Sequence, residues 1–239
     1  MQFFGSLLFT TLLLILTPTW GLAMFALFFL PQRGQFAMAR AWARTLLWLL
    51  RVLCRLDYQV SGLENLPKGA HVVMWKHSSS WETIAQMVIF PPQVWVLKRE
   101  LMWLPLVGWG LAMTRPIAVN RSAGHTAVKH VVEQGKNRIG RGYWVSIFPE
   151  GTRMPPGETR KYGVSGVLLA QATGCLLVPV AHDAGFYWPR RGLRKKRGTI
   201  RVNIGAPLSA ADRDPRQLNE ELQRWIEERV RSMSASMPG

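Results

Sequence analysis

The sequence predicts an α/β protein in which a sheet is flanked by helices and an apolar N-terminal segment precedes the folded domain. Two observations predict this class. Along residues 57–210, short apolar runs typical of buried strands alternate with segments of helical spacing. Before them, the first 35 residues carry Arg33 as their only charged side chain. A chain of 239 residues is long enough for one such domain with a short appendage, and too short for two enzymatic domains.

The N-terminal stretch over residues 5–30 is uncharged, strongly apolar and interrupted by Pro18. As one helix it is long enough to cross a bilayer core of about 30 Å, at a rise of about 1.5 Å per residue. It lacks the basic start and the small-residue cleavage site of a signal peptide, so we expect the protein to retain it.

A second helix is expected over residues 36–56, with a Trp- and Leu-rich body. Its arginines recur at positions that share one helical face: Arg40, Arg44, Arg51 and Arg55. This pattern is typical of a helix that lies in the headgroup layer of a membrane. The alternative is a helix of the folded domain with a solvated basic face. In either case the positive charge predicts that the following domain lies in the cytoplasm.

The elements after residue 56 follow from apolar runs, helical spacing and turn residues. Strands are expected at 58–60, 70–75, 94–98, 117–119, 144–148, 176–181 and 198–204. Helices are expected at 83–90, 101–111, 123–138, 165–173 and 215–233. We therefore expect membrane-anchoring helices over 1–56, a catalytic domain over 57–210, and an amphipathic docking helix with a tail over 211–239.

The charge of the chain restricts its partners. The formal net charge is +16 and the sequence pI is about 11.0, so both nucleic acid and an anionic lipid surface are plausible polyanions. No pattern typical of an RNA- or DNA-binding motif stands out, so we expect no nucleic-acid partner. A membrane-tethered basic binding protein is the alternative from a different class.

Metal and thiol chemistry find little support. Cys54 and Cys175 lie in apolar surroundings without the spacing of a disulfide framework or a zinc site, so we expect reduced core cysteines. His71, His77 and Glu82 offer three potential ligands, but the two histidines flank a strand and lie too far apart to share one ion. A serine hydrolase also fails, because residues 163–166 are not a Gly-x-Ser-x-Gly turn.

One candidate catalytic pair stands directly after the strand expected at 70–75. His77 and Glu82 lie five positions apart around the entry to a helix. At that spacing the carboxylate can hold one ring nitrogen while the other takes a proton from an attacking alcohol. A histidine that only forms structural hydrogen bonds is the alternative.

A second candidate is the hexapeptide Phe148-Pro-Glu-Gly-Thr-Arg153, in which a strand ends in a sharp turn. The guanidinium of Arg153 offers a fork suited to phosphate, and Gly151 lets backbone amides approach an anion. Taken alone, the segment is equally well read as a surface turn with an incidental ion pair.

Together the two motifs resemble the glycerolipid acyltransferase family, whose hallmarks are a histidine followed five positions later by aspartate and the sequence Phe-Pro-Glu-Gly-Thr-Arg. Two weaker blocks also match: Lys98-Arg-Glu-Leu101 with Pro105 and Gly108 ahead of Asn120-Arg121, and Leu177-Val-Pro-Val-Ala181. The resemblance covers about residues 60–204. The departure from the family is Glu82, which is longer than aspartate by one methylene.

The resemblance implies a mixed sheet flanked by helices and the following roles. His77 deprotonates an acceptor hydroxyl that attacks an acyl thioester directly, and Glu82 stabilises the imidazolium. The acceptor phosphate is held by Lys98, Arg121 and Arg153, in a pocket shaped by Glu150, Gly151 and Thr152. An acyl-chain groove is expected near Trp103, Leu104 and Trp109. Neither a metal nor an organic cofactor is needed.

The reaction implied is transfer of a fatty acyl chain from acyl carrier protein or coenzyme A to the sn-2 hydroxyl of lysophosphatidic acid, which gives phosphatidic acid in phospholipid biosynthesis. Other lysolipids, such as lyso-ornithine lipid, or glycerol 3-phosphate would use the same base. The basic segment Arg190–Arg197 offers a docking surface for a carrier protein, for coenzyme A phosphates or for anionic lipid, unless it is a solvated charge run.

Overall fold

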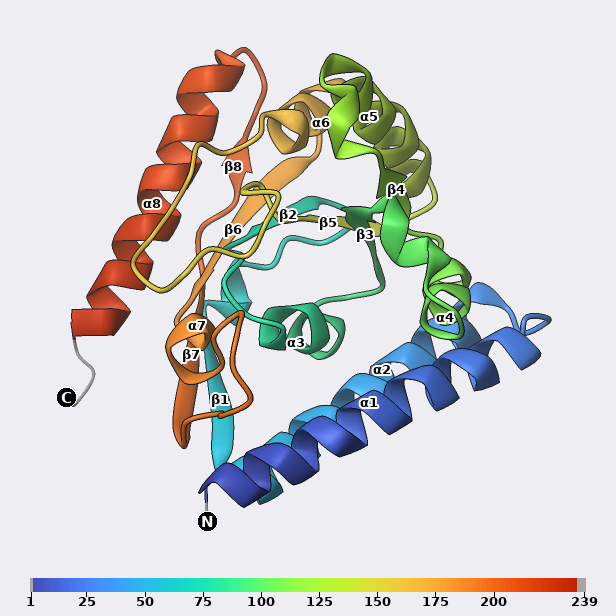
Figure 1. Cartoon of the computed structure of the whole chain (residues 1–239). Helices are drawn as coiled ribbons and strands as arrows, with labels where there is room; N and C mark the ends of the chain where they lie inside the picture. Colours follow the sequence, from blue (N-terminus) through green and yellow to red (C-terminus); the bar gives the residue numbers. More distant parts are fainter. Residues whose placement is uncertain (1, 236–239) are drawn as a thin grey trace.

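A mixed sheet forms the centre of the fold (Figure 1). The computed structural model describes residues 2–235, and in that part of the chain the sheet has eight strands. They are β1 (Leu56–Ser61), β2 (Val72–Trp75), β3 (Gln93–Lys98), β4 (Ile117–Val119), β5 (Trp144–Ile147), β6 (Leu176–His182), β7 (Gly198–Ile204) and β8 (Leu208–Ser209). All seven strands predicted from the sequence are confirmed, and the short β8 was not predicted.

The strand order is β1-β7-β6-β2-β5-β3-β4, and β8 pairs with β6. β2 is parallel to both of its neighbours, since Val72 pairs with Val145 of β5 on one side and with Leu177 of β6 on the other. β7 runs antiparallel to β6, which makes the sheet mixed. A central parallel strand is covered on both faces, which explains the unbroken apolar run of β2. The predicted fold class, a mixed sheet flanked by helices, is confirmed.

Helices cover both faces of the sheet. Figure 1 shows α1, α2 and α3 on one side and α5, α6 and α8 on the other. The bounds are α1 (Gln2–Ala26), α2 (Gln32–Cys54), α3 (Trp81–Ile89), α4 (Val107–Met113), α5 (His125–Gly140), α6 (Ser165–Thr173), α7 (Ala184–Tyr187) and α8 (Pro215–Ala235). Three short 3-10 helices are η1 (Leu63–Asn65), η2 (Arg99–Trp103) and η3 (Arg121–Ala123).

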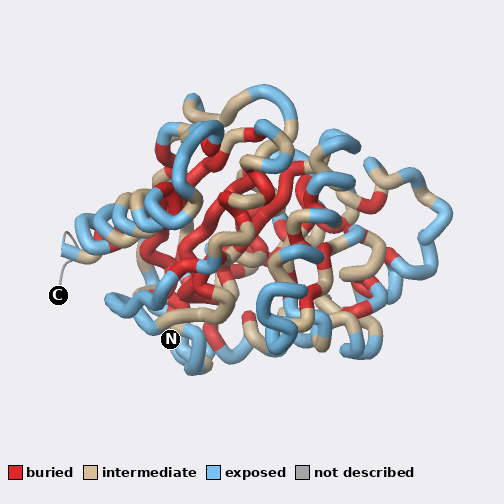
Figure 2. The backbone as a smooth tube through the Cα atoms, turned by 90° about the horizontal axis from the view of Figure 1, so that it is seen from above, coloured by how far each residue is buried: buried red, intermediate tan, exposed pale blue. Residues whose placement is uncertain are grey.

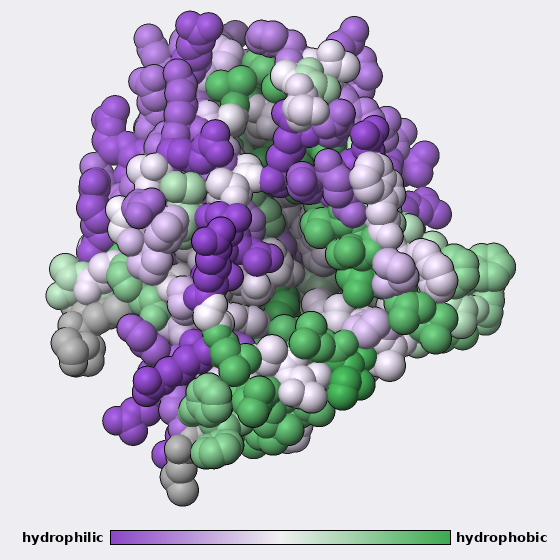
Figure 3. Space-filling view, in the orientation of Figure 1, coloured by the Kyte–Doolittle hydropathy of each residue, from purple (hydrophilic) through white to green (hydrophobic). Residues whose placement is uncertain are grey.

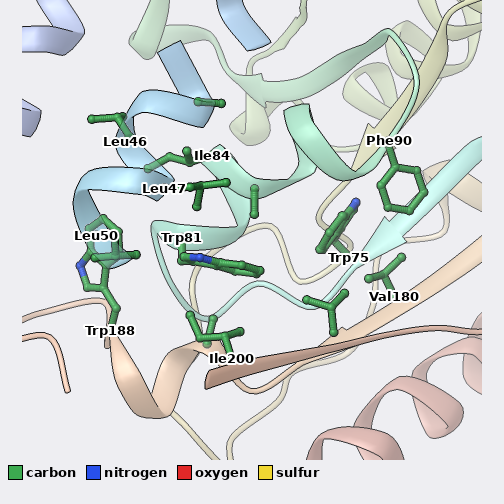
Figure 4. Close-up of a cluster of buried hydrophobic side chains, with 14 of the residues drawn as sticks. Leu46, Leu47, Leu50, Trp75, Trp81, Ile84, Phe90, Val180, Trp188 and Ile200 are labelled. Atoms are coloured by element: carbon green, nitrogen blue, oxygen red, sulfur yellow. The ribbon is translucent and has the colours of Figure 1, made fainter. Parts of the chain in front are cut away.

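Alternate residues of β2 enter two different cores. Val73 and Trp75 belong to the cluster shared with α2 and α3, whereas Val72 and Met74 belong to the cluster shared with α6 and α8. This alternation follows from the two-residue period of a strand. Figure 4 shows the first cluster, in which leucines of α2 meet Trp81 of α3. Figure 2 shows that the buried backbone follows the strands of the sheet.

Helix α1 packs against the rest of the protein near both of its ends. Near its start, Gln2 Nε2 donates to the carbonyls of Cys54 at 2.9 Å and Lys195 at 2.7 Å. Near its end, Gly21 and Gly110 of α4 are so close that a Cβ on Gly110 would lie 2.6 Å from Gly21 Cα. The helix runs unbroken through Pro18 and has the length and composition of a membrane-spanning helix.

The outer face of the N-terminal helix pair exposes large apolar side chains. They include Phe3, Phe4, Leu7, Leu8, Leu14, Ile15, Leu22 and Phe25 of α1, and Trp48 and Val52 of α2. Figure 3 shows this apolar surface along the lower edge of the molecule, below a strongly polar upper part. An apolar surface of this extent is typical of a protein that associates with a membrane.

The second predicted helix is confirmed as α2, but its arginine face does not all point to solvent. Arg40 donates to the carbonyls of Met87 at 3.1 Å and Phe90 at 2.9 Å, at the end of α3. Arg51 pairs with Asp57 at 3.2 Å on the surface. Part of the basic face therefore attaches α2 to the domain, whereas the alternative interpretation expected a solvated basic face.

The helix predicted over residues 101–111 is wrong, because the chain breaks into η2 and α4. Pro105 lies at the break and has no N–H to donate to a helix. Leu106 has a φ of 63°, a left-handed conformation that no α-helix accommodates. The break turns α4 so that Gly108 and Gly110 are buried, Gly110 against α1.

Candidate active site

Three neighbouring parallel strands bring polar residues to one edge of the sheet. Lys76 and His77 directly follow β2, Glu150 follows β5, and His182 ends β6. The carboxyl ends of adjacent parallel strands meet at the same edge, where α/β proteins gather their ligand-binding residues. As a result, His182 Nε2 lies 2.8 Å from the carbonyl oxygen of Lys76.

His77 and Glu82 form a buried pair at the start of α3. His77 Nδ1 lies 2.9 Å from Glu82 Oε1. The same carboxylate oxygen accepts the backbone N–H groups of Ser78 at 2.9 Å and Ser79 at 2.8 Å. These groups precede the first turn of a helix, where unpaired N–H groups attract negative charge. Local structure therefore fixes the carboxylate against the ring nitrogen.

The surroundings keep His77 in its uncharged form. Burial lowers the pKa of the imidazole from its ordinary value of 6.5, and the positive charge of Arg153 acts in the same direction. The hydrogen bond and negative charge of Glu82 raise the pKa, but do not reverse the shift. Burial raises the pKa of Glu82, but its hydrogen bond with His77 and the electrostatic influence of His182 lower it below 4.5. An uncharged imidazole beside a carboxylate is the protonation state that a general base requires.

A second histidine, His182, lies behind Glu82. Its Nε2 donates to the Lys76 carbonyl, and its Nδ1 accepts the backbone N–H of Ala184 at 3.2 Å. Nε2 is also 3.9 Å from Glu82 Oε2, an oxygen that accepts no hydrogen bond from the residues that the structure describes. His182 was not among the site residues predicted from the sequence, although it stands one residue beyond the end of a predicted strand.

The segment after β5 folds directly onto the loop that carries His77. Glu150 Oε2 accepts the backbone N–H of His77 at 2.7 Å. The backbone N–H of Met154 donates to the His77 carbonyl at 2.8 Å. The ring of Phe148 stacks on the imidazole with the centroids 4.2 Å apart. The two motifs that were separate in the sequence therefore form one site.

Glu150 forms hydrogen bonds with the loop that carries His77 and does not line an open pocket. It is 2% exposed, and Lys76 Nζ lies 2.7 Å from its Oε1. Burial raises the pKa of Glu150 to about 7, although the charge and hydrogen bond of Lys76 lower it. Glu150 was predicted to shape the phosphate pocket. No role was predicted for Lys76, because its partners are distant in the sequence.

Comparison with known proteins identifies the family. A family model described as acyltransferase matches residues 57–183, which contain both motifs. This chain belongs to the acyltransferase family. It is 40% identical over 238 residues to a 1-acyl-sn-glycerol-3-phosphate acyltransferase of Pseudomonas aeruginosa, across 98% of this chain and 93% of that one.

Two further relatives extend this result. The chain is 30% identical over 176 residues to a 1-acyl-sn-glycerol-3-phosphate acyltransferase of Saccharomyces cerevisiae, which covers 70% of this chain and 56% of the yeast protein. The crystal structure of a 1-acyl-sn-glycerophosphate acyltransferase from Thermotoga maritima superimposes with a TM-score of 0.82, covering 100% of this chain and 98% of that one. At 19% identity this likeness shows a shared fold.

The basic residues that sequence analysis assigned to phosphate in this acyltransferase do not all lie at the site. Arg121 donates to the carbonyl of Gly151, which has a φ of 68°. Arg153 is half-buried and lies close enough to influence the charge of His77. Lys98 is exposed at the end of β3, and its Nζ lies 3.8 Å from a carboxylate oxygen of Glu100. The structure thus places Arg121 and Arg153 at the Gly151 turn, and Lys98 on the surface.

The residues expected to line an acyl-chain groove are on the surface near α1. Trp103 is 65% exposed, and Leu104 and Trp109 are exposed as well. The ring of Trp109 lies 5.3 Å from that of Phe25 in α1. A cavity of about 350 Å³ lies elsewhere, between β1, β7 and the end of α8, and none of the site residues lines it. The acyl-binding role of these residues stays a prediction.

His71 and the two cysteines hold structural positions away from the His77–Glu82 pair. Among residues 2–235, no group of three or more histidine, cysteine or acidic side chains is placed to hold a metal. His71 Nε2 bonds the carbonyl of Lys68 at 2.9 Å, and its Nδ1 accepts the backbone N–H of Leu176 at 3.1 Å. Cys54 and Cys175 are buried and unpaired with each other.

Proposed function

We propose that this acyltransferase moves a fatty acyl chain from an acyl thioester to the sn-2 hydroxyl of lysophosphatidic acid, with His77 as general base and Glu82 as its partner. The observation that carries the proposal is the buried His77–Glu82 hydrogen bond of 2.9 Å. It occupies Nδ1, so Nε2 is the ring atom that takes a proton. Support for the acceptor comes from the names of the relatives in Pseudomonas aeruginosa and Saccharomyces cerevisiae.

The reaction needs one proton to move twice. The acceptor hydroxyl oxygen attacks the thioester carbonyl carbon as its proton passes to His77 Nε2. The tetrahedral intermediate then collapses, the carbon–sulfur bond breaks, and the imidazolium returns the proton to the departing thiolate. Glu82 stabilises the imidazolium between these steps. General-base help of this kind contributes on the order of 10²- to 10⁴-fold to the rate.

The acceptor phosphate is proposed to bind at the Gly151 turn. Arg153 lies close enough to His77 to lower the pKa of its imidazole, and Arg121 donates to the Gly151 carbonyl of the same turn. A phosphate held there would present an acceptor hydroxyl to Nε2, and Thr152 and the backbone of the turn would complete its contacts. Lys98 is kept as a phosphate ligand in this proposal, provided that its exposed side chain turns inward.

The acyl chain and the membrane are proposed to meet on one face of the protein. A long acyl chain binds mainly through apolar contact, at about 0.8 kcal/mol per buried methylene. Trp109 lies against Phe25 of α1, and Trp103 and Leu104 are exposed shortly before it in the chain, so a chain leaving the bilayer along α1 would meet this segment. We place the protein on the bacterial inner membrane with residues 57–210 on the cytoplasmic side. The division at residues 56 and 210 stays a prediction.

The test is acyl transfer by purified, detergent-solubilised protein to lysophosphatidic acid, from acyl-coenzyme A and in parallel from acyl carrier protein. Phosphatidic acid should form with the wild type and vanish with His77→Ala, which should keep the fold. Product that persists in the variant would remove His77 as base. If neither donor gives product, the acceptor is wrong, and lyso-ornithine lipid is the next lysolipid to assay.

A further inference from the structure

We propose that Glu227, on the C-terminal helix α8, is a positioning residue that sets both the catalytic loop and the Arg153 turn through a buried network with Lys76. This inference rests on the proposed function, since it assigns Glu227 to the same site. Glu227 does not touch the reacting atoms. It lies on a helix outside the two motifs, 145 positions after Glu82.

The centre of the network is a buried ammonium group. Lys76 Nζ lies 2.7 Å from Glu150 Oε1, and 2.9 and 3.1 Å from the two carboxylate oxygens of Glu227. It also donates to the carbonyl of Glu158 at 2.9 Å. The Lys76 side chain is 2% exposed and that of Glu227 is 12% exposed. A charge at this depth requires charged partners, so the position of Lys76 depends on both carboxylates.

This network determines where the His77 backbone lies. Lys76 holds Oε1 of Glu150, and Oε2 of the same carboxylate accepts the N–H of His77 at 2.7 Å. With both oxygens engaged, the Glu150 carboxylate is fixed in rotation. Loss of Glu227 would leave the ammonium with one carboxylate and free it to shift, and the His77 peptide would shift with Glu150.

Glu227 also forms hydrogen bonds with the segment that follows the Arg153 turn. Its Oε1 accepts the hydroxyls of Thr159 at 2.9 Å and Tyr162 at 2.8 Å. Both residues belong to the connection between the Gly151 turn and α6. The Glu227 carboxylate therefore contacts both Lys76, which directly precedes His77, and the segment that follows Arg153.

The attachment of α8 to the domain does not depend on Glu227. Leu218, Leu222 and Ile226 of the helix are fully buried in the core shared with α6. Asn219 Nδ2 donates to the Tyr162 carbonyl at 2.9 Å. Removing the Glu227 carboxylate should therefore leave the helix docked, so that its effect on the site can be measured.

The test compares Glu227→Ala with Glu228→Ala in the solubilised full-length protein. Glu228 is the next residue of the same helix and is exposed. Its replacement by Ala changes the charge and the helix propensity by the same amount as Glu227→Ala does. We expect Glu227→Ala to lower kcat about 10- to 100-fold, because small displacements of a base have effects of this size. Glu228→Ala should behave as the wild type. Equal kcat values for the two variants would overturn the proposal.

Two further measurements separate positioning from general destabilisation. Glu227→Gln keeps acceptors for Thr159 and Tyr162 but loses the charge opposite Lys76. Glu227→Ala should also raise the KM for the acceptor, because the segment after Arg153 loses its hydrogen bonds to the Glu227 carboxylate. Glu227→Gln should restore this KM toward the wild-type value while kcat stays reduced. Recovery of neither constant, together with a lowered melting temperature, would indicate a structural role alone and overturn the proposal.

Backbone hydrogen exchange tests the network even if lysophosphatidic acid is not the acceptor. Glu227→Ala should speed exchange in residues 76–80 and 152–162, with the N–H of His77 included, and leave the β1 and β7 strands unchanged. The Glu228→Ala protein provides the baseline. Unchanged exchange at 76–80 would overturn the inference, whereas failure of the wild type to acylate lysophosphatidic acid would overturn only the proposed acceptor.

Discussion

The ring of Phe148 stacks on the ring of His77, with the centroids 4.2 Å apart and the planes inclined by 25°. Phe148 directly follows β5, the strand that leads into the Gly151 turn, so this contact joins the proposed phosphate site to the proposed base. The stacked ring covers one face of the imidazole while Glu82 holds its edge at Nδ1. The imidazole is thereby fixed in plane and in rotation before any substrate arrives, which is the preorganisation that efficient proton transfer needs.

Replacing Glu82 tests its partnership with His77. Glu82→Gln removes the negative charge and places an amide among three hydrogen-bond donors, so we expect kcat to fall on the order of 10³-fold. Glu82→Asp keeps the charge but shortens the side chain by one methylene, and we expect a loss of about ten-fold. Steady-state kinetics with a saturating donor measure both. A Gln variant as active as the Asp variant would show that the charge of Glu82 has no catalytic role.

The pH dependence of the reaction follows from the lowered pKa of His77. Protonated His77 cannot accept a proton. Activity is therefore lost as pH falls through the pKa that His77 has in the folded protein, which lies below 6.5. The pKa of His77 is lower in the folded protein than in the unfolded chain, so His77 contributes to the stability of the fold above pH 6.5. This contribution is lost as pH falls through the lowered pKa of His77. An NMR titration of the histidines, with the His77 signal identified by its absence in His77→Asn, gives the midpoint directly. A midpoint above 6.5 would contradict the prediction.

Arg153 should act mainly on acceptor binding. A charge-assisted hydrogen bond from its guanidinium to phosphate is worth about 1.5–3 kcal/mol, so Arg153→Ala should raise the KM for a phosphate-bearing acceptor roughly 10- to 100-fold. We expect kcat to change less. Arg224→Ala on the exposed face of α8 is the matched control for the loss of one positive charge. An unchanged KM would place the phosphate elsewhere.

The sequence predicted the part of the site whose geometry is local. His77 and Glu82 belong to one strand–turn–helix unit, so their five-residue spacing alone implies contact. The strands of the central sheet were predictable for a similar reason, because apolar runs such as that of β2 contain the signal within a few residues.

The rest of the site depends on contacts between distant segments. Lys76 meets Glu227 across 151 positions, and His182 meets Lys76 across 106. Spacing carries no information about such pairs, because they follow from which strands become neighbours in the sheet and where α8 docks. Pro105 inside the helix predicted over 101–111 was a visible sign of a break, but the left-handed conformation of Leu106 was not predictable, since it is unusual for a leucine.

The close approach of Gly21 and Gly110 provides a test of how α1 is attached. A Cβ on Gly110 would lie 2.6 Å from Gly21 Cα, so Gly110→Ala must push α4 away from α1. Overpacking of this kind costs about 1–3 kcal/mol, and we expect a lower melting temperature of the solubilised protein. Gly140→Ala is the matched control, because it lies in the last turn of α5 with no atom within 4 Å of the added Cβ. In a helix that change favours folding by up to about 1 kcal/mol, so the two variants should shift the melting temperature in opposite directions. Equal shifts would mean that α1 does not pack on α4 in solution, and the apolar face of α1 would then no longer be fixed relative to His77.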